Sequence, residues 1–452
     1  MKKFCLRFQN SIRLLFELLI YGGSFFLLFA LLGIENRQVC VLSRTSVIMT
    51  IMYIMAVYLL TRIYGGFVPE NSSSRSNTLS VGLPIMFSSC ASYVIFLIMS
   101  VNDANARRFQ FKSFGYFFAS LVLSGLFSAF IVGIGDRFYR WLLPPERAIV
   151  IISKAGDEAE VRRVIAAYGK RYQIESVRHF DAPDIHSLIK GSDAAFFYDV
   201  PPEERWDLVN YCYKHRINVY LNPEIADVVE MASKQMLFMD VPFLVHAARK
   251  MTFEQRVVKR LLDIFLPLIG LIVTSPILLL AVIMIKLDDG GSVFFKQKRA
   301  TINGRVFEII KFRTMREDAG VFSATKGDDR ITRAGRFLRK YRIDELPQLI
   351  NIIRGDMSLV GPRPEMLENV NEYEKELPEF RYRLRMKAGL TGYAQIVGRY
   401  NTSSRDKLIL DLIYIENFSI LLDIKLLFQT VLVLFNAEDS TEGFKRDKCD
   451  ES

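Results

Sequence analysis

The chain has 452 residues, half of them hydrophobic, and a net charge of +10 at pH 7. This length predicts two or three folded parts, and the basic excess favours anionic partners. The five cysteines lack C-x-x-C spacing, which argues against a disulfide framework. All histidines lie before residue 250, which excludes His/Cys metal sites and histidine-based acid/base chemistry from the C-terminal part; they are His179, His186, His215 and His246.

Four apolar runs near the N-terminus approach the roughly 20 residues that span a bilayer. They extend from about Leu14 to Ile34, Val47 to Tyr64, Val81 to Val101 and Phe114 to Ile134. We expect a four-helix transmembrane region over residues 1–140. The larger set of basic residues places the N-terminus inside, and everything after Arg137 is then cytoplasmic.

Residues 147–248 alternate between strand-like and helix-like segments. RAIVIIS, DAAFFYDV and INVYLNP resemble strands, and Asp157 to Tyr168 and Pro202 to His215 resemble helices. This pattern predicts a Rossmann-like domain. The loop after the first strand has only Gly156 where a dinucleotide site needs several glycines, so we expect no NAD and a regulatory or assembly role.

A fifth apolar run, Ile264 to Ile285, is interrupted by Pro267 and by the pair Ser275 and Pro276. Proline removes a backbone hydrogen bond and kinks a helix. The run is compatible with a kinked hairpin that enters and leaves one leaflet or with a kinked spanning helix.

The segment Arg342 to Glu365 has the properties of an active site. Apolar residues at helical spacing predict a helix that starts at the acid pair, Asp344 and Glu345, and ends at Gly355. Asp344 would lie at or near the N-cap, where backbone N–H groups and the helix dipole keep a carboxylate ionised. Because neighbouring helical residues point in different directions, we expect one acid to attack and the other to hold a metal.

Basic residues surround the acid pair. Arginine recurs at every third position from Arg330 to Arg339, and Arg363 is held between two prolines. Guanidinium groups match phosphate oxygens, and a divalent cation would relieve repulsion between a carboxylate and a diphosphate. For any single arginine, a solvated basic face or a contact with anionic lipid remains an alternative.

Several segments stand in the order expected of a known family. They are KRLLDIFLPLIGLIVTSP from Lys259, GGSVFFKQKR from Gly290, KFRTM from Lys311, GDDRITRAGRFLRKYRIDELPQ from Gly327, MSLVGPRP from Met357 and GLTGYAQIVGR from Gly389. The C-terminal part thus resembles the bacterial sugar transferases, which are monotopic polyprenyl-phosphate phosphoglycosyl transferases. The layout is similar to the large subgroup that primes capsule, O-antigen and exopolysaccharide synthesis.

The resemblance implies a two-step reaction. Asp344 would attack the β-phosphate of a UDP-sugar, expel UMP and hold the phosphosugar as an aspartyl ester, which polyprenyl (undecaprenyl) phosphate then collects. Glu345 would bind Mg²⁺, with Mn²⁺ as an alternative cofactor. Arg339 would contact the polyprenyl phosphate and Arg363 the nucleotide, and we expect two further residues to face phosphate, Lys311 and Arg313.

The resemblance also implies the fold and the location. We expect a mixed α/β membrane protein of the bacterial cytoplasmic membrane, with a mostly helical catalytic domain over 253–440 on the cytoplasmic face and a flexible tail over 441–452. A re-entrant helix over 260–287 would bend at Ser275 and Pro276. Membrane lipids and a second copy of the chain are the expected partners. Thr301 replaces a glycine that relatives carry, which matters only if that position needs a positive φ.

Three functions compete. The alternative to the enzyme is a non-catalytic assembly or regulatory protein, whose acid pair would merely cap a helix. Nucleic-acid binding is disfavoured by the membrane spans and by the absence of a base-stacking aromatic pattern. The segment Leu408 to Phe435 mixes apolar clusters with four charged residues, Asp411, Glu416, Asp423 and Lys425. It predicts amphipathic helices on the membrane surface, with core helices as the alternative. The sequence does not select the sugar.

Overall fold

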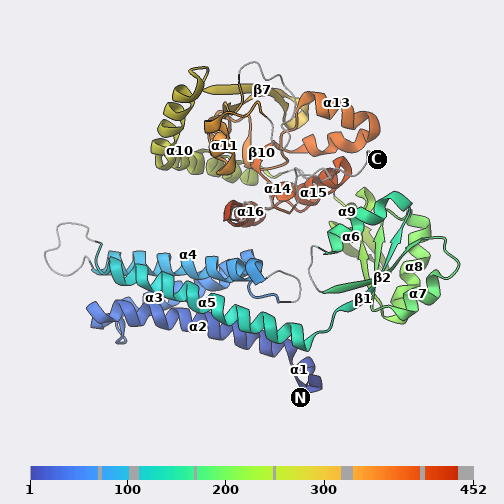
Figure 1. Cartoon of the computed structure of the whole chain (residues 1–452), viewed down its shortest axis with the longest axis horizontal. Coiled ribbons are helices and arrows are strands. Elements are labelled where there is room, and N and C mark those ends of the chain that lie inside the picture. The colour runs from blue at the N-terminus through green and yellow to red at the C-terminus, as the bar shows by residue number, and fades with distance from the viewer. Residues whose placement is uncertain are drawn as a thin grey trace. The chain divides into compact units, whose positions relative to one another are not determined.

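The computed structural model describes residues 2–69, 74–100, 111–166, 171–247, 251–316, 329–397 and 403–435 (Figure 1). The chain divides into two compact units, Met1–Asn222 and Pro223–Ser452. The domain limits expected from the sequence stay predictions, and the expected tail at 441–452 lies outside the described residues.

The first unit begins with long apolar helices. After the short α1 (Lys2–Arg7) come α2 (Gln9–Glu35), η1 (Arg37–Val39), α3 (Arg44–Tyr64), α4 (Ser74–Ser100) and α5 (Phe114–Leu142). With α10 of the second unit, these four long helices make five in the described ranges that are long and apolar enough to cross a membrane. The prediction of a membrane protein is confirmed.

The four long helices are apolar on both their inner and outer faces. Leu28 and Leu32 of α2 are fully buried, whereas Leu15 and Phe26 of the same helix are 65% and 69% exposed. A helix that is apolar all round suits a lipid environment. Inside the bundle, Asn77 of α4 donates a hydrogen bond to Asp136 of α5 at 2.9 Å, which gives this buried carboxylate a partner.

A parallel sheet completes the first unit. Its four strands lie in the order β2 (Tyr172–His179), β1 (Glu146–Ile152), β3 (Ala194–Tyr198) and β4 (Asn218–Leu221). The helices are η2 (Ala155–Asp157), α6 (Glu158–Ala166), α7 (Ile185–Gly191) and α8 (Pro202–His215).

Helices cover both faces of this sheet. Ile149 and Ile151 of β1 share a core with α7 and α8, while Val150 and Ile152 share one with α6. Burial on both faces explains why β1 is apolar without alternation. The strand-and-helix alternation agrees with the sequence, although β2, whose residues are only partly buried, was missed. A Rossmann-like relationship and the absence of NAD stay predictions.

The second unit contains the remaining elements. They are α9 (Ile225–Met231), β5 (Lys234–Phe238), β6 (Val241–Val245), α10 (Phe253–Asp289), β7 (Phe294–Ala300), η3 (Ile302–Gly304), β8 (Val306–Phe312), α11 (Arg333–Lys340), η4 (Ile343–Glu345), α12 (Gln348–Arg354), β9 (Ser358–Val360), α13 (Leu367–Glu376), η5 (Pro378–Arg385), β10 (Gly389–Thr391), α14 (Tyr393–Val397), α15 (Ser404–Glu416) and α16 (Ile420–Phe435). Strands β5 and β6 form a hairpin, β7 pairs antiparallel with β8, and β9 pairs parallel with β10.

The long helix α10 contacts this unit at both ends. At its start, Asp263 accepts hydrogen bonds from Ser358 Oγ (3.0 Å) and Leu359 N (2.8 Å) of β9. At its end, Asp288 accepts one from Ala334 N, in the first turn of α11 (2.9 Å). Between these ends the helix passes Pro267 and Pro276 and changes direction (Figure 1). Its middle exposes apolar side chains, including Ile272 (66%) and Val273 (69%).

The three carboxylates of α15 and α16 that follow Leu408 are buried rather than exposed to solvent. Asp411, Glu416 and Asp423 are 1%, 8% and 3% exposed. Asp423 pairs with Lys259 of α10 at 2.5 Å and accepts a hydrogen bond from the Tyr414 hydroxyl at 2.7 Å. Burial of these carboxylates agrees with the alternative of core helices, and a position of α15 and α16 on the membrane surface stays a prediction.

Candidate active site

The acid pair lies in η4, a single 3-10 turn between α11 and α12. Arg342 precedes it in the left-handed conformation, with φ of 53°. The following helix α12 begins at Gln348, after Pro347, and ends at Arg354, where Gly355 forms the C-cap with φ of +91°. The predicted helix end is confirmed. The predicted N-cap position of Asp344 is wrong, because Pro347, which suits a first turn, marks the start of the helix three residues later.

Glu345 is held by two cations. Lys311 Nζ lies 3.2 Å and Arg363 Nη2 3.4 Å from the same oxygen, Oε1. The Glu345 side chain is only 19% exposed. Burial opposes its ionisation, but Lys311, Arg363 and Arg342 outweigh burial and lower the pKa of Glu345 to about 2. Glu345 is therefore a fixed negative charge at neutral pH.

Asp344 has the opposite electrostatic environment. Burial and the neighbouring charge of Glu345 raise its pKa to about 6, although Lys311 and Arg339 act in the other direction. The sequence predicted that a helix N-terminus keeps Asp344 ionised. Asp344 does not occupy that N-terminus, so this explanation of its ionisation is wrong. At pH 7 Asp344 is still mostly ionised, but it is a more basic and more weakly stabilised carboxylate than an ordinary aspartate.

The predicted phosphate-binding residues fall into two groups. Lys311, Arg339 and Arg363 act electrostatically on the acid pair. Arg339 Nε donates to Thr314 Oγ1 at 2.8 Å, which fixes part of its side chain. Arg313, by contrast, is buried and pairs with Asp289 at the end of α10. Its contact indicates a structural link between β8 and α10, and a phosphate role for Arg313 stays a prediction.

Two residues fix α12 behind the acid pair. Asn351 donates to Glu308 O (2.7 Å) and accepts from Ile310 N (2.9 Å), so it joins α12 to β8, the strand that leads to Lys311. Arg260 of α10 donates to the carbonyls of Ile352 and Ile353 at 2.8 and 2.6 Å, which satisfies the end of α12. Both residues were missed in the sequence, where Arg260 belongs to the quoted segment from Lys259 but has no visible partner.

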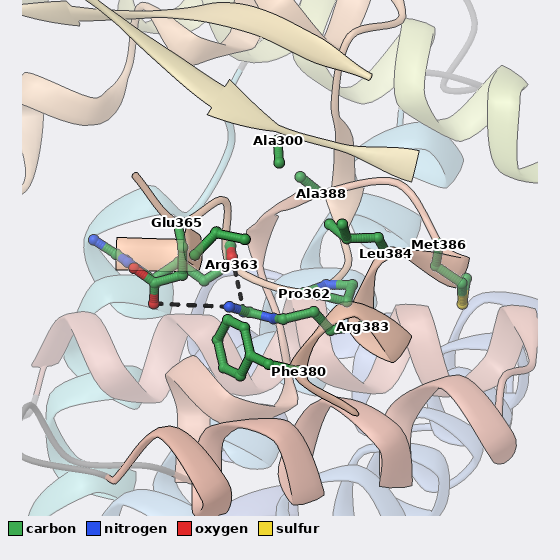
Figure 2. A pocket seen from close by; sticks show the side chains of 10 residues that line it. Ala300, Pro362, Arg363, Glu365, Phe380, Arg383, Leu384, Met386 and Ala388 are labelled. Carbon is green, nitrogen blue, oxygen red and sulfur yellow. Dashed lines mark hydrogen bonds and ion pairs between the residues drawn. The ribbon is translucent and has the colours of Figure 1, made fainter. Parts of the chain in front are cut away.

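The Pro362–Glu365 segment is held by the backbone of β10, where Gly389 N donates to Pro362 O at 2.8 Å, and by side chains from two further elements. Arg383 of η5 donates to the Arg363 carbonyl at 2.8 Å (Figure 2), and Arg299 of β7 donates to the Pro364 carbonyl at 3.2 Å. Burial opposes ionisation of Glu365, but Lys407 and Arg383, at 3.6 and 3.9 Å, outweigh it and lower the pKa of Glu365. Four buried or partly buried charges thus surround the backbone that presents Arg363.

One histidine does reach the second unit. His246 follows β6, and its Nε2 lies 3.5 Å from Glu416 Oε2 on α15. All histidines precede residue 250 in the sequence, yet the expectation that none reaches the catalytic part is wrong, because His246 contacts α15, the helix against which α9 also packs. Its partner Glu416 also pairs with Arg385 at 3.3 Å, a contact that is structural in character.

Thr301 shows that the replaced glycine is not required here. Its φ is −130°, an ordinary extended conformation. The side chain is fully buried, donates to Asp356 O and accepts from Ala388 N, both at 3.1 Å. The loop therefore uses the hydroxyl to connect two backbone segments.

The acid pair fits one mode of magnesium binding. Among the described residues, no group of three His, Cys, Asp or Glu side chains is placed to hold a metal ion. Mg²⁺ is, however, commonly held by one or two carboxylates together with substrate phosphates. Both ion pairs of Glu345 end on Oε1, so Oε2 takes no part in them. Two adjacent acids beside Lys311 and Arg363 are compatible with this mode, and Mg²⁺ binding stays a prediction.

Comparisons with known proteins decide the family. A profile described as "Bacterial sugar transferase" matches residues 254–437. A protein of Caulobacter vibrioides, named UDP-glucose:undecaprenyl-phosphate glucose-1-phosphate transferase, is 42% identical over 190 residues, which cover 40% of this chain and 71% of that protein. This chain belongs to the bacterial sugar transferase family. The family predicted from the sequence is confirmed.

Two further relatives carry other sugar names. An Aeromonas hydrophila protein, UDP-N-acetylgalactosamine-undecaprenyl-phosphate N-acetylgalactosaminephosphotransferase, is 42% identical over 180 residues, 38% of this chain and 43% of that protein. The galactosyl transferase CpsE of Streptococcus agalactiae is 36% identical over 244 residues, 50% of this chain and 54% of that protein. The chain thus spans about half the length of these two relatives, and their names differ in the sugar.

Proposed function

We propose that this sugar transferase moves a sugar-1-phosphate from a UDP-sugar to polyprenyl phosphate, releases UMP and thereby initiates cell-surface polysaccharide synthesis. The observation that carries the proposal is the unequal acid pair. Asp344 is an ionised carboxylate with a pKa of about 6, beside a Glu345 whose negative charge is fixed by Lys311 and Arg363.

The first step forms a covalent bond. An Asp344 carboxylate oxygen attacks the β-phosphorus of the UDP-sugar, the bond from that phosphorus to the bridging oxygen breaks, and UMP leaves with that oxygen. Asp344 suits this role because a poorly stabilised carboxylate is a better nucleophile than one that is fully paired. Arg363 and Lys311 are close enough to the acid pair to bind the donor phosphates.

The second step regenerates the carboxylate. An oxygen of polyprenyl phosphate attacks the same phosphorus, the acyl phosphate bond breaks, and Asp344 leaves as the free carboxylate. Arg339 would hold the acceptor phosphate, and its Nε contact with Thr314 limits the positions that its guanidinium can reach.

Mg²⁺, or Mn²⁺ in its place, would be held by Glu345 with the diphosphate oxygens. When bound, the ion would neutralise phosphate charge next to the acid pair and stabilise the departing UMP. The protein's own cations complete this compensation, because Lys311 and Arg363 already lie on one oxygen of Glu345.

We further propose that α10 is re-entrant. Its two ends both contact the second unit, through Asp263 and Asp288, so a helix that crossed the bilayer would have to leave one of these contacts. A straight helix of 37 residues would be about 55 Å long, well beyond a hydrocarbon core of about 30 Å. We place its bend at Ser275 and Pro276. The two prolines inside the helix, its change of direction (Figure 1) and its exposed apolar middle support entry into a single leaflet, with the acid pair on the cytoplasmic face of the bacterial inner membrane.

The proposal is tested by nucleotide product. Purified protein in lipid nanodiscs, with Mg²⁺ and undecaprenyl phosphate, would be given UDP-glucose, UDP-galactose and UDP-N-acetylated sugars. The expected product is UMP with one donor preferred. Release of UDP would indicate direct glycosyl transfer, and no nucleotide product from folded protein would favour the assembly role. A homodimer and the lack of NAD and nucleic acid as partners stay predictions.

A further inference from the structure

The position of Arg363 depends on groups that are distant in the sequence. Its side chain is 45% exposed and reaches Glu345 at 3.4 Å. The flanking prolines restrict φ at positions 362 and 364, yet they do not determine where the segment lies relative to η4. Three hydrogen bonds to carbonyls of this segment can do so. One comes from the backbone, Gly389 N to Pro362 O (2.8 Å), and two come from the side chains of Arg383 and Arg299.

Of the two side-chain contacts, Arg383 makes the shorter one, and it does so from a buried position. Its residue is 3% exposed. Nη2 donates to the Arg363 carbonyl at 2.8 Å and also lies 2.6 Å from Asp411 Oδ2, while Nε donates to the same Asp411 oxygen at 2.9 Å. Figure 2 shows this guanidinium between Phe380 and the backbone of Arg363. It points toward the carboxylate of Glu365. One planar group therefore ties α15 to the loop that presents Arg363.

This arrangement uses the geometry of arginine. The fork of the guanidinium can contact a carboxylate along one edge while a remaining N–H reaches a carbonyl, whereas a lysine ammonium is a compact point charge. Burying such a pair adds little stability compared with apolar residues of the same size. What the buried Arg383–Asp411 pair can contribute instead is a fixed position for the Arg363 carbonyl that it binds.

We infer that Arg383, held by Asp411, is a positioning residue for the donor-binding Arg363. The inference rests on the proposed function, in which Arg363 contacts the nucleotide diphosphate. Arg383 itself touches no reacting atom. Its loss should weaken donor binding without removing the nucleophile or the acceptor site.

The test is Arg383→Lys in nanodiscs, with UMP release measured against UDP-sugar and against polyprenyl phosphate. We expect the donor KM to rise about tenfold or more, with kcat within about twofold and an unchanged acceptor KM. The matched control is Arg385→Lys, because Arg385 lies on the same η5 and pairs with Glu416 of α15 but has no described contact with residues 362–364. The control should leave the donor KM within about twofold.

A double-mutant cycle separates positioning from general destabilisation. If Arg383 acts through Arg363, Arg383→Lys should raise the donor KM no further in an Arg363→Ala background. Asp411→Asn replaces Arg383→Lys if the latter fails to fold, and the same non-additivity is expected. The inference would be overturned if Arg383→Lys left the donor KM unchanged, or if the effects of the two substitutions added fully. An active wild-type enzyme would still support the proposed function in that case. Inactive wild type would instead contradict the proposed function.

Discussion

Asp344→Asn is expected to stabilise the protein while it abolishes transfer. The folded state raises the pKa of this carboxyl from the ordinary 3.8 to about 6, chiefly by burial. The folded protein therefore binds the proton more tightly than the unfolded chain does. The stability linked to this proton is present below about pH 4 and is lost as the pH rises through about 6.

The size of the effect follows from the pKa difference. A rise of about two units corresponds to about 3 kcal/mol of unfolding free energy that the wild type lacks at pH 7.5. An asparagine does not ionise, so the variant avoids this loss. For a unit of this size, 1 kcal/mol shifts Tm by about 2–4 °C, and we expect Tm of Asp344→Asn to exceed wild type by roughly 6–12 °C at pH 7.5.

The assay is thermal unfolding in nanodiscs from pH 4 to pH 7.5, with UMP release measured in parallel. The difference between Asp344→Asn and wild type should grow with pH and level off above about 6. Asp356→Asn is the control, because it removes an exposed ion pair with Arg305 (3.2 Å) and should change stability by no more than about 1 kcal/mol. An Asp344→Asn variant that is less stable than wild type at pH 7.5, or a difference independent of pH, would refute the reasoning.

Three further outcomes are expected. Transfer requires ionised Asp344, so kcat/KM should rise about tenfold per pH unit below about pH 6 and level off above it; a flat profile from pH 5 to pH 7 would contradict that role. Lys259→Met leaves the buried Asp423 without its cation and should lower the unfolding free energy by about 3–5 kcal/mol. The double variant Lys259→Met/Asp423→Leu should recover most of this loss, and an equal loss in the single and double variants would contradict the buried ion pair. Gly335→Ala places a Cβ against the Thr314 carbonyl and should displace α11, which would lower both Tm and UMP release. Gly156→Ala has open space around its Cβ position and should change neither, and a Gly335→Ala variant with wild-type Tm and UMP release would contradict the packing.

The sequence predicted elements whose signals are local. Helix α8 matches its expected range at Pro202–His215, and Gly355 ends α12 as its position after an apolar run predicts. The edge strand β2 was missed because none of its residues is fully buried and its exposed positions include the charged residues Glu175 and Arg178. The start of α12 was placed too early because two acids before an apolar run resemble a cap, although Pro347 marks the first turn.

The polar contacts inside the second unit could not be predicted in the same way. Asp411 and Asp423 gave helices α15 and α16 an amphipathic pattern, yet each is buried against a cation from a distant segment, Arg383 or Lys259. A charged residue in an apolar helix gives the same sequence pattern whether it faces water or a buried partner. The pKa of Asp344 has a similar origin, because burial and its neighbours set it rather than its place in the sequence.

The most direct test of the account is the mass of the protein after incubation with its preferred UDP-sugar and Mg²⁺ in the absence of polyprenyl phosphate. The account predicts a stoichiometric addition of one sugar phosphate, located to the peptide that contains Asp344, absent from Asp344→Asn and removed when polyprenyl phosphate is added. UMP release by wild type without any such adduct, or an adduct that persists in Asp344→Asn, would contradict Asp344 as the nucleophile.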